Sequence, residues 1–327
     1  MGEVKEFLCE NAQRIDVFLS TQIGQTRSQV VQLIKMDCVY VDGKKVNRPG
    51  VKLKPNQTVK VEFPELKEQD MSNFTLDWAD DVEILFEDDD VLVINKPSGV
   101  IVHPAPSVKE ATLVDWLKLK GIRLSTISGE ERHGIVHRLD KGTSGAMVVA
   151  KNNEAHEFLS AQLQDKTMGR YYVAVLTPPL KDDITTIETH IGRSSTNRLK
   201  MANVENGKYA KTMFKQLALS GDEKNQLLAC KLFTGRTHQI RVHLESINRH
   251  IIGDHIYALT PKDEKSERIM LHAYSIYFIH PTTKEKISLV ASLDSSMQEY
   301  INKKFDSENL DEVMDSEYII NSFSSII

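Results

Sequence analysis

The feature that most limits the fold of this chain is a series of short apolar runs rich in β-branched and aromatic residues. Gly, Pro, Asn or charged residues bound each run, which is typical of β-strands. These runs are residues 91–94, 146–150, 171–175 and 227–233. Helical patterns at residues 113–120 and 154–163 lie between them, without the regular strand–helix alternation of a parallel sheet. The sequence therefore predicts a mixed α+β fold built on a largely antiparallel sheet.

The 327 residues exceed one average domain, and their composition changes along the chain. A small α+β unit is expected at residues 14–61, where an apolar helical stripe precedes two β-rich segments joined by Asp42-Gly43, a pair favoured in tight hairpins. It carries nine basic and three acidic residues. The predicted order is an N-terminal segment, the small unit, an acidic linker, a large domain that carries the reactive motifs, and an acidic tail. Their ranges are 1–13, 14–61, 62–80, 81–304 and 305–327.

The net charge of −5 is unevenly distributed. Residues 62–90 hold twelve acids against one lysine, and residues 305–327 hold six acids and no base. The remainder has 40 basic and 28 acidic residues, a net of +12. Such an excess can form a phosphate-binding face, although it can also simply solvate the surface. The acidic tail is expected either to form an amphipathic helix or to stay disordered.

Cysteine content and hydropathy limit the class of protein. Cys9, Cys38 and Cys230 are far apart and form no C-x-x-C pair, so they are expected to be reduced thiols without a disulfide or zinc role. The first residues lack a signal-peptide pattern, and no run approaches the roughly 18 apolar residues of a membrane helix. We therefore expect a cytoplasmic protein that does not contact membranes.

The first reactive motif is a polar loop that leads directly into an apolar strand. Residues 137–145 read His-Arg-Leu-Asp-Lys-Gly-Thr-Ser-Gly. Asp140 lies beside Arg138 and Lys141, and neighbouring cations keep a partly buried carboxylate ionised. Taken alone, the motif is better interpreted as a salt-bridged surface loop.

The second motif runs from a strand through a glycine turn into an expected helix. Residues 234–244 read Thr-Gly-Arg-Thr-His-Gln-Ile-Arg-Val-His-Leu. If Thr237 caps that helix, then His238, Arg241 and Glu245 share one face. The arginine can then reach into a cleft and bind a carboxylate. Residues 268–273, Arg-Ile-Met-Leu-His-Ala, follow downstream.

With these motifs in this order, residues 91–281 resemble the RluA/RluD family of pseudouridine synthases. The resemblance implies four site positions, which are Asp140, Tyr172, Arg241 and Leu271. Tyr172 is preferred to Tyr171 because the family's tyrosine stands two residues before an alanine, here Ala174.

The resemblance also implies the reaction, in which the N1–C1′ bond of uridine breaks and C5 bonds to C1′ without a cofactor. Asp140 is expected to initiate cleavage, either by attacking C1′ or by removing the 2′ proton. Arg241 would pair with Asp140, and Tyr172 would stack on the base. Arg138 is expected to fill the position that the target uridine vacates in its helix.

Residues 14–61 resemble the S4-type RNA-binding module, with Arg-Ile-Asp at 14–16 and Thr-Arg-Ser at 26–28. The module usually has Gly where Asp37 stands and Asn where Asp42 stands. Its expected role is docking on folded RNA by shape and phosphate contacts. The residues expected to bind RNA or substrate are Arg138, Leu271, Arg236, His238, Lys96, Arg27, Lys35, Lys44 and Lys45.

The expected partner is structured RNA, preferably large-subunit ribosomal RNA or assembling ribosomal particles, and the chain is expected to be a monomer. Transfer RNA is the second substrate, and an S4-domain assembly factor without isomerase activity is the alternative function. The histidine pairs His133 with His137 and His238 with His243 raise the possibility of a metal site. No H-E-x-x-H motif or Cys/His cluster accompanies them, so no metal is expected.

Overall fold

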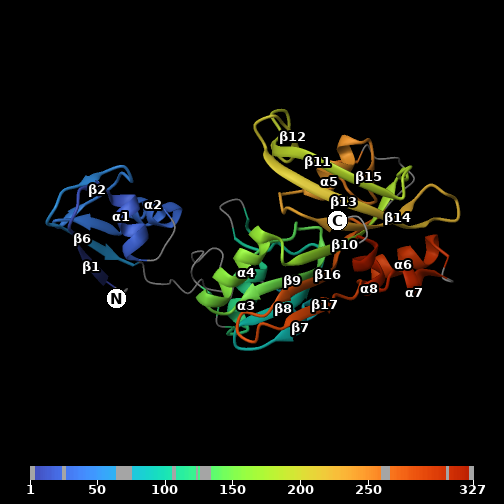
Figure 1. Cartoon of the computed structure of the whole chain (residues 1–327), viewed down its shortest axis with the longest axis horizontal. Coiled ribbons are helices and arrows are strands. Elements are labelled where there is room, and N and C mark those ends of the chain that lie inside the picture. The colour runs from blue at the N-terminus through green and yellow to red at the C-terminus, as the bar shows by residue number, and fades with distance from the viewer. Residues whose placement is uncertain are drawn as a thin grey trace. The chain divides into compact units, whose positions relative to one another are not determined.

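The computed structural model describes residues 4–23, 27–63, 76–104, 108–122, 124–125, 134–258, 266–306 and 309–323. The chain divides into two compact units, shown as ribbons in Figure 1. The small unit comprises residues 1–75 with 125–134, and the large unit comprises residues 76–124 with 135–327. No helix in the described ranges is long and apolar enough to cross a lipid bilayer.

The small unit is a sheet with two helices packed on it. Its sheet has the strand order β1-β6-β3-β4, and β1 pairs antiparallel with β6. The unit thus extends back to residue 4, whereas the sequence analysis began it at residue 14. Its elements are β1 (Val4–Cys9), β2 (Gln13–Arg14), α1 (Ile15–Gln22), α2 (Arg27–Lys35), β3 (Val39–Val41), β4 (Lys44–Lys45), β5 (Lys52–Leu53) and β6 (Gln57–Glu62).

The two helices bury apolar residues at helical spacing. Ile15, Phe18 and Leu19 of α1 are buried, as are Val30 and Ile34 of α2. All five belong to one core cluster with strand residues of the same unit. Thr26, which opens the S4-like helix motif, and residues 64–75, most of the predicted linker, lie outside the described residues.

Two aspartates adopt backbone conformations that explain the sequence preferences of such a module. Asp42 and Gly43 have φ values of 49° and 76° and connect β3 to β4, as the hairpin prediction requires. Asp37 has a φ of 61°, in the left-handed region that favours glycine. The departure from Gly at this position is therefore tolerated, because Asp enters this region more readily than most residues.

The large unit contains the remaining elements. Its strands are β7 (Glu83–Glu87), β8 (Val91–Lys96), β9 (Ser144–Ala150), β10 (Gly169–Thr177), β11 (Ile184–Arg193), β12 (Met201–Asn203), β13 (Lys208–Leu219), β14 (Gln226–Leu232), β15 (His250–Ile251), β16 (Leu271–Ile279) and β17 (Lys286–Val290). Its helices are η2 (Ala79–Asp81), α3 (Leu113–Leu119), α4 (Asn153–Asp165), α5 (Gln239–Ser246), α6 (Ser295–Lys304), α7 (Leu310–Val313) and α8 (Ser316–Ser322).

One long sheet organises the large unit, with the order β12-β11-β13-β14-β10-β16-β9-β8-β7. Strand β15 pairs with β10, and β17 pairs with β16. Among the described strands, β9 and β16 form the parallel pair, and the other named pairs in this sheet are antiparallel. The predicted α+β class with a largely antiparallel sheet is confirmed.

The central strands are buried on both faces, which explains their continuous apolar sequences. In β8, Leu92 and Ile94 belong to one core cluster and Val91 and Val93 to another. The first cluster includes residues of α3, and the second includes residues of α4. These two helices therefore cover opposite faces of the same part of the sheet.

The acidic C-terminal segment is helical and packed. Leu310, Ile319 and Phe323 are buried in the same cluster as β10. The ring of Phe323 lies 5.7 Å from that of Tyr171, centroid to centroid. Of the two expectations for this tail, the helical one is the conformation of the described residues.

Candidate active site

The large unit contains a cavity of about 630 Å³ at which several distant segments meet. The polar loop at residues 137–143, strand β10, the end of α4 and the turn before α5 all contribute to its lining. The predicted site residues that line it are Asp140, Tyr172, Arg241, Arg138, Leu271, Arg236 and His238. The fold thus brings together residues that are up to 133 positions apart in the chain.

The loop that carries Asp140 is held by the Asn-Lys-Pro-Ser-Gly turn after β8. The backbone N–H of Gly99 donates to the carbonyl of Lys141 over 2.8 Å. The hydroxyl of Ser98 donates to the carbonyl of Gly142, also over 2.8 Å. These two bonds fix the residues that directly follow the carboxylate.

The same loop enters β9 through a glycine that no other residue could replace without strain. Gly145 has a φ of +114°, and a Cβ atom there would lie 2.3 Å from the carbonyl oxygen of Ala273. Close approach of β9 to β16 therefore requires glycine. Asp140 precedes β9 and Leu271 begins β16, so the close approach of the two strands places both residues at the same cavity.

Arg241 binds two carboxylates at once. Its Nε and Nη2 donate to Asp254 over 2.7 and 2.8 Å, while its Nη1 donates to Oδ2 of Asp140 over 3.3 Å. Burial opposes the ionisation of Asp254, but its bonds with Arg241 keep the pKa of this carboxyl below the usual value. Asp254 thus orients the guanidinium, and the more exposed Asp140 receives one remaining N–H group.

The turn before α5 differs from the predicted one. Thr237 was expected to cap the helix, but α5 begins at Gln239 and its N-cap is His238, with a φ of 57° and no side-chain cap bond. The predicted shared face is also incomplete, because Glu245 binds Lys200 and does not line the cavity. The left-handed backbone conformation of His238 could not be predicted from the sequence, because glycine is the residue that normally indicates this conformation.

His238 lies beside Asp140 with its ring held from behind. Its Nε2 is 3.9 Å from Oδ2 of Asp140, and its Nδ1 shares a 2.8 Å hydrogen bond with the hydroxyl of Tyr257. Burial lowers the pKa of His238, although Asp140 opposes this effect. The imidazole is therefore mainly neutral at neutral pH.

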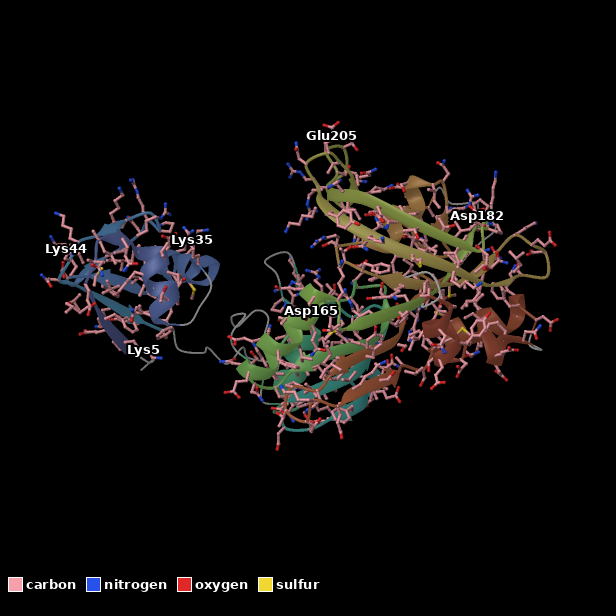
Figure 2. All side chains as sticks on the ribbon, viewed as in Figure 1. Lys5, Lys35, Lys44, Asp165, Asp182 and Glu205 are labelled. Carbon is pink, nitrogen blue, oxygen red and sulfur yellow. The ribbon has the colours of Figure 1, made fainter. Side chains whose placement is uncertain are left out.

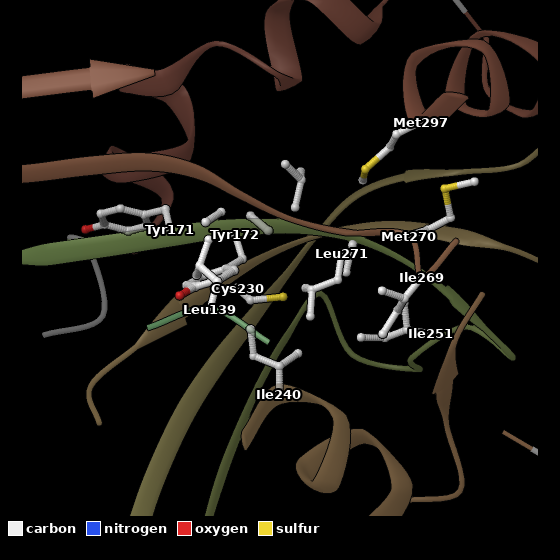
Figure 3. Close-up of a cluster of buried hydrophobic side chains, with 14 of the residues drawn as sticks. Leu139, Tyr171, Tyr172, Cys230, Ile240, Ile251, Ile269, Met270, Leu271 and Met297 are labelled. Atoms are coloured by element: carbon white, nitrogen blue, oxygen red, sulfur yellow. The ribbon is translucent and has the colours of Figure 1, made fainter. Parts of the chain in front are cut away.

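Tyr172 and Tyr171 extend to opposite sides of β10, as Figure 3 shows. Tyr172 lines the cavity, and burial raises the pKa of its phenol, which therefore stays protonated at neutral pH. Tyr171 packs against Tyr277 and Phe323 on the other side. Tyr172 is thus the tyrosine that faces Asp140.

Apolar and cationic side chains complete the lining. Leu139, Ile240 and Leu271 are buried next to Tyr172 in the cluster of Figure 3. Arg138 is exposed, and its Nη1 lies 3.2 Å from Nε2 of His103. The side-chain Nε of Arg236 donates to the carbonyl of Tyr209 over 2.9 Å.

The expectation that Lys96 binds RNA is wrong. Its side chain is completely buried, and its ammonium donates to the carbonyls of Pro97 and Val100 over 2.8 and 2.9 Å. A further carbonyl, that of Lys141, lies 3.5 Å away. Burial lowers the pKa of Lys96 to about 7. Lys96 therefore holds the turn that supports the Asp140 loop and does not reach solvent.

The predicted RNA-binding residues of the small unit lie on its surface. Lys35, Lys44 and Lys45 are exposed, and Figure 2 shows Lys35 and Lys44 projecting from this unit. Arg27 is also exposed, but it forms an ion pair with the buried Asp16 over 2.6 Å. It therefore has a structural role besides any contact with RNA.

The histidines of the metal hypothesis have other partners. His137 Nε2 accepts the backbone N–H of Val148, and burial lowers the pKa of His137 to about 3. His243 shares hydrogen bonds with Thr212 and Thr189. His133 lies outside the described residues. Within the described ranges, no group of three or more His, Cys, Asp or Glu side chains could hold a metal ion.

Sequence reasoning missed three residues of this site. Asp254 was not predicted as a site residue, although it binds Arg241. Tyr257 binds His238 from a segment 19 residues away, which no local pattern indicates. Arg170 lines the cavity beside Tyr172, and the two-residue repeat of a strand could have predicted it.

Comparison with known proteins decides the family. The model of the RNA pseudouridylate synthase family matches residues 90–246, and that of the S4 domain matches residues 13–59. An uncharacterised RNA pseudouridine synthase of Helicobacter pylori strain J99 is 47% identical over 95% of this chain and 95% of its own length. This chain is an RNA pseudouridine synthase. The predicted resemblance of both units is confirmed.

Two further relatives place the synthase in a wider group. The ribosomal large subunit pseudouridine synthase D of Zymomonas mobilis is 36% identical over 87% of this chain and 92% of its own length. The solved structure of human RNA pseudouridylate synthase domain containing 1 is 27% identical with a TM-score of 0.54, covering 66% of this chain and 84% of that one. The synthase is therefore an enzyme that acts on uridine in RNA, with an S4 domain as a second RNA-binding unit.

Proposed function

We propose that this synthase converts uridine to pseudouridine in large-subunit ribosomal RNA, with Asp140 as the catalytic carboxylate. The observation that carries the proposal is the position of Asp140 in the cavity, 3.3 Å from Arg241 and opposite an apolar group that includes Tyr172. A carboxylate held by one N–H donor keeps other lone pairs for the ribose. The name of the Zymomonas relative and the S4 domain support ribosomal RNA as the substrate.

The side chains suit an isomerisation that neither adds nor removes a group. The N1–C1′ bond breaks, the uracil turns, C5 bonds to C1′, and the proton of C5 leaves while N1 gains one. Asp140 begins cleavage either by bonding to C1′ or by removing the 2′ proton, and both roles need an ionised carboxylate. Arg241 donates a hydrogen bond to Asp140, and Asp254 keeps Arg241 in place.

The remaining lining residues would hold the detached base and the RNA. Tyr172 would stack on the uracil, and Leu139 and Leu271 would exclude water while the base turns. Arg138, exposed at the cavity, would occupy the place of the flipped uridine in its helix. Arg236 and His238 would contact the RNA from the turn before α5.

The test is release of tritium from transcripts of large-subunit ribosomal RNA that contain 5-tritiated uridine. Wild-type protein should release tritium, and Asp140→Asn should lower the rate by more than roughly 1,000-fold while the RNA still binds. Asp182→Asn, an exposed aspartate of the same unit, is the matched control and should keep full activity. If Asp140→Asn stayed active, another group would have to initiate the reaction.

A second measurement identifies the substrate. Pseudouridine mapping in a strain that lacks the gene should show unmodified uridines in large-subunit ribosomal RNA. Loss of pseudouridine from transfer RNA would instead favour the second substrate. If wild-type protein bound RNA but released no tritium from any of these transcripts, an S4-domain assembly factor would be the better description. We further propose that it acts as a monomer in the cytoplasm, where its RNA is made.

A further inference from the structure

Strand β10 presents two side chains to the cavity at successive positions of its pleat. Arg170 and Tyr172 are two residues apart and both line the cavity, while Tyr171 between them faces the opposite core. Two residues of a strand span roughly 6.8 Å, so the guanidinium is displaced from the tyrosine by about one nucleotide unit. The backbone of a base stacked on Tyr172 would therefore pass within reach of a long side chain at position 170.

The charge of Arg170 has no partner in the described part of the chain. Its side chain is half-buried, its Nε is buried without a hydrogen-bond acceptor, and none of the described Asp or Glu side chains forms an ion pair with it. Burial lowers the pKa of Arg170, yet an arginine remains protonated in proteins. Arg241 is buried with two carboxylates, in contrast. The side chain of Arg170 is half-buried at the cavity, so its guanidinium is available to an anion that enters there.

Gly235 leaves the space that this guanidinium occupies. A Cβ atom at Gly235 would lie 2.9 Å from Nη1 of Arg170 and 3.3 Å from Nη2. The glycine turn after β14 thus accommodates the head group, although no residue of the turn neutralises it. Asp140 is the acidic residue among the side chains that line the cavity. Five basic residues line it as well: Arg138, Lys166, Arg170, Arg236 and Arg241.

We propose that Arg170 binds a backbone phosphate of the RNA at the target uridine. This inference rests on the proposed function, since it assumes that the base enters the cavity beside Tyr172. The guanidinium fork matches the oxygens of a phosphate, which would supply the missing negative charge. Arg170 is then a substrate-binding residue whose charge is uncompensated in the unbound protein.

The test compares Arg170→Met with wild type in binding to unmodified large-subunit ribosomal RNA and transfer RNA transcripts. Methionine keeps an unbranched side chain without the charge, so the melting temperature should stay the same or rise. RNA binding should weaken by roughly ten-fold, and the slope of log K against log salt should become less steep by about 0.7. Lys303→Met, an exposed lysine on α6, removes the same charge outside the cavity and should change neither value.

Gly235→Ala provides a second test that keeps the charge. The methyl group would push the flexible end of Arg170 aside, so binding should weaken in the wild-type background. It should have no further effect on binding in the Arg170→Met background. Independent, additive losses would contradict the contact between the two positions.

The outcomes separate this inference from the proposed function. An unchanged salt slope in Arg170→Met, or a melting temperature several degrees lower, would show that Arg170 serves the fold and overturn the phosphate contact. If the slope changes but wild-type protein releases no tritium, the phosphate contact stands and the isomerase proposal fails. If wild-type protein releases tritium but the salt slope of Arg170→Met is unchanged, the isomerase proposal stands and the phosphate contact fails.

Discussion

At the scale of single residues, Arg241 joins a buried carboxylate to a partly exposed one. Asp254 accepts two N–H groups of Arg241 and also the backbone N–H groups of Ile256 and Tyr257. Of these donors, only Arg241 also donates to Asp140, over 3.3 Å. The arginine is therefore positioned by Asp254, and its contact with Asp140 can lengthen as the substrate arrives.

Replacing Asp254 with Asn should test this arrangement. The buried guanidinium would lose the better paired of its two counter-charges, so the free energy of unfolding should fall by about 3 kcal/mol. Arg241 would turn towards Asp140 and bind it more tightly, which should lower the rate of tritium release by roughly ten-fold or more at saturating RNA. Single-turnover kinetics and thermal unfolding measure the two effects.

Asp183→Asn is the control for that change. Asp183 pairs with Lys215 at the surface, and its side chain is 64% exposed. Exposed pairs contribute little, so both the rate and the stability should stay close to wild type. An Asp254→Asn protein with normal kinetics would show that Arg241 keeps its position without Asp254.

Individual site residues were predictable where the signal is local. The resemblance to the synthase family indicated Tyr172, by its distance to Ala174, and Asp140, in a polar loop before an apolar strand, and both residues line the cavity. Lys96 was misjudged because a polar turn after a strand normally faces solvent. Its burial depends on the carbonyl of Lys141, 45 positions later, and such a partner is invisible in the local sequence.

At the scale of elements, one aspartate joins the two helices of the small unit. Asp16, at the start of α1, accepts bonds from Arg14 over 2.9 Å and from Arg27, the first residue of α2, over 2.6 Å. The hydrogen bond from Arg14 lowers the pKa of Asp16 from 3.8 to about 2. Burial opposes this effect, and Arg27 adds to it. The carboxylate stabilises the small unit only while it is ionised.

The sign of the pH dependence follows from that lowered pKa. The stabilisation by Asp16 should be complete above about pH 4 and should be lost as the pH falls towards 2, and it corresponds to about 2 kcal/mol. Asp16→Asn should therefore destabilise the small unit at neutral pH and make its stability less dependent on pH in this acidic range. Hydrogen exchange of residues 15–61 in the full chain measures both.

Glu62→Gln is the matched control for the loss of stability at acidic pH. Glu62 pairs with Lys60 at an exposed position, with 42% of its side chain accessible, so the change should be small. Equal protection of residues 15–61 in wild type and Asp16→Asn would contradict the role of Asp16.

Four strands that are largely buried on both faces were predictable from the sequence, although β16, which lies among them in the sheet, was not predicted as a strand. The runs at 91–94, 146–150, 171–175 and 227–233 correspond to β8, β9, β10 and β14 in the middle of the sheet. Strand β11 was missed because its exposed face carries polar residues such as Glu188 and His190. Its apolar alternation is too sparse to stand out from a loop.

At the scale of the whole molecule, the proposed function assigns RNA docking to the basic small unit and the reaction to the cavity of the large unit. Lys44→Glu combined with Lys45→Glu should weaken RNA binding by roughly ten-fold or more, because two phosphate-attracting charges become repulsive. The rate at saturating RNA should stay the same, since neither residue lines the cavity. Tritium release over a range of RNA concentrations separates the two constants.

The same charge change on α3 is the control. Lys118→Glu with Lys120→Glu alters two exposed lysines of the large unit and should affect binding less. Equal losses in both double variants would mean that total charge, and not the S4 domain, determines affinity. A lower rate at saturation would link the small unit to the reaction itself.

The parallel pairing of β9 with β16 has a consequence for folding kinetics. His272 pairs with Ser144 and Ala273 with Gly145, so this junction closes a loop of more than 120 residues. Antiparallel neighbours such as β13 and β14 need only short closures and can form early. Asp140 and Leu271 lie at the junction of β9 and β16, so we expect the cavity that they line to be completed late in folding.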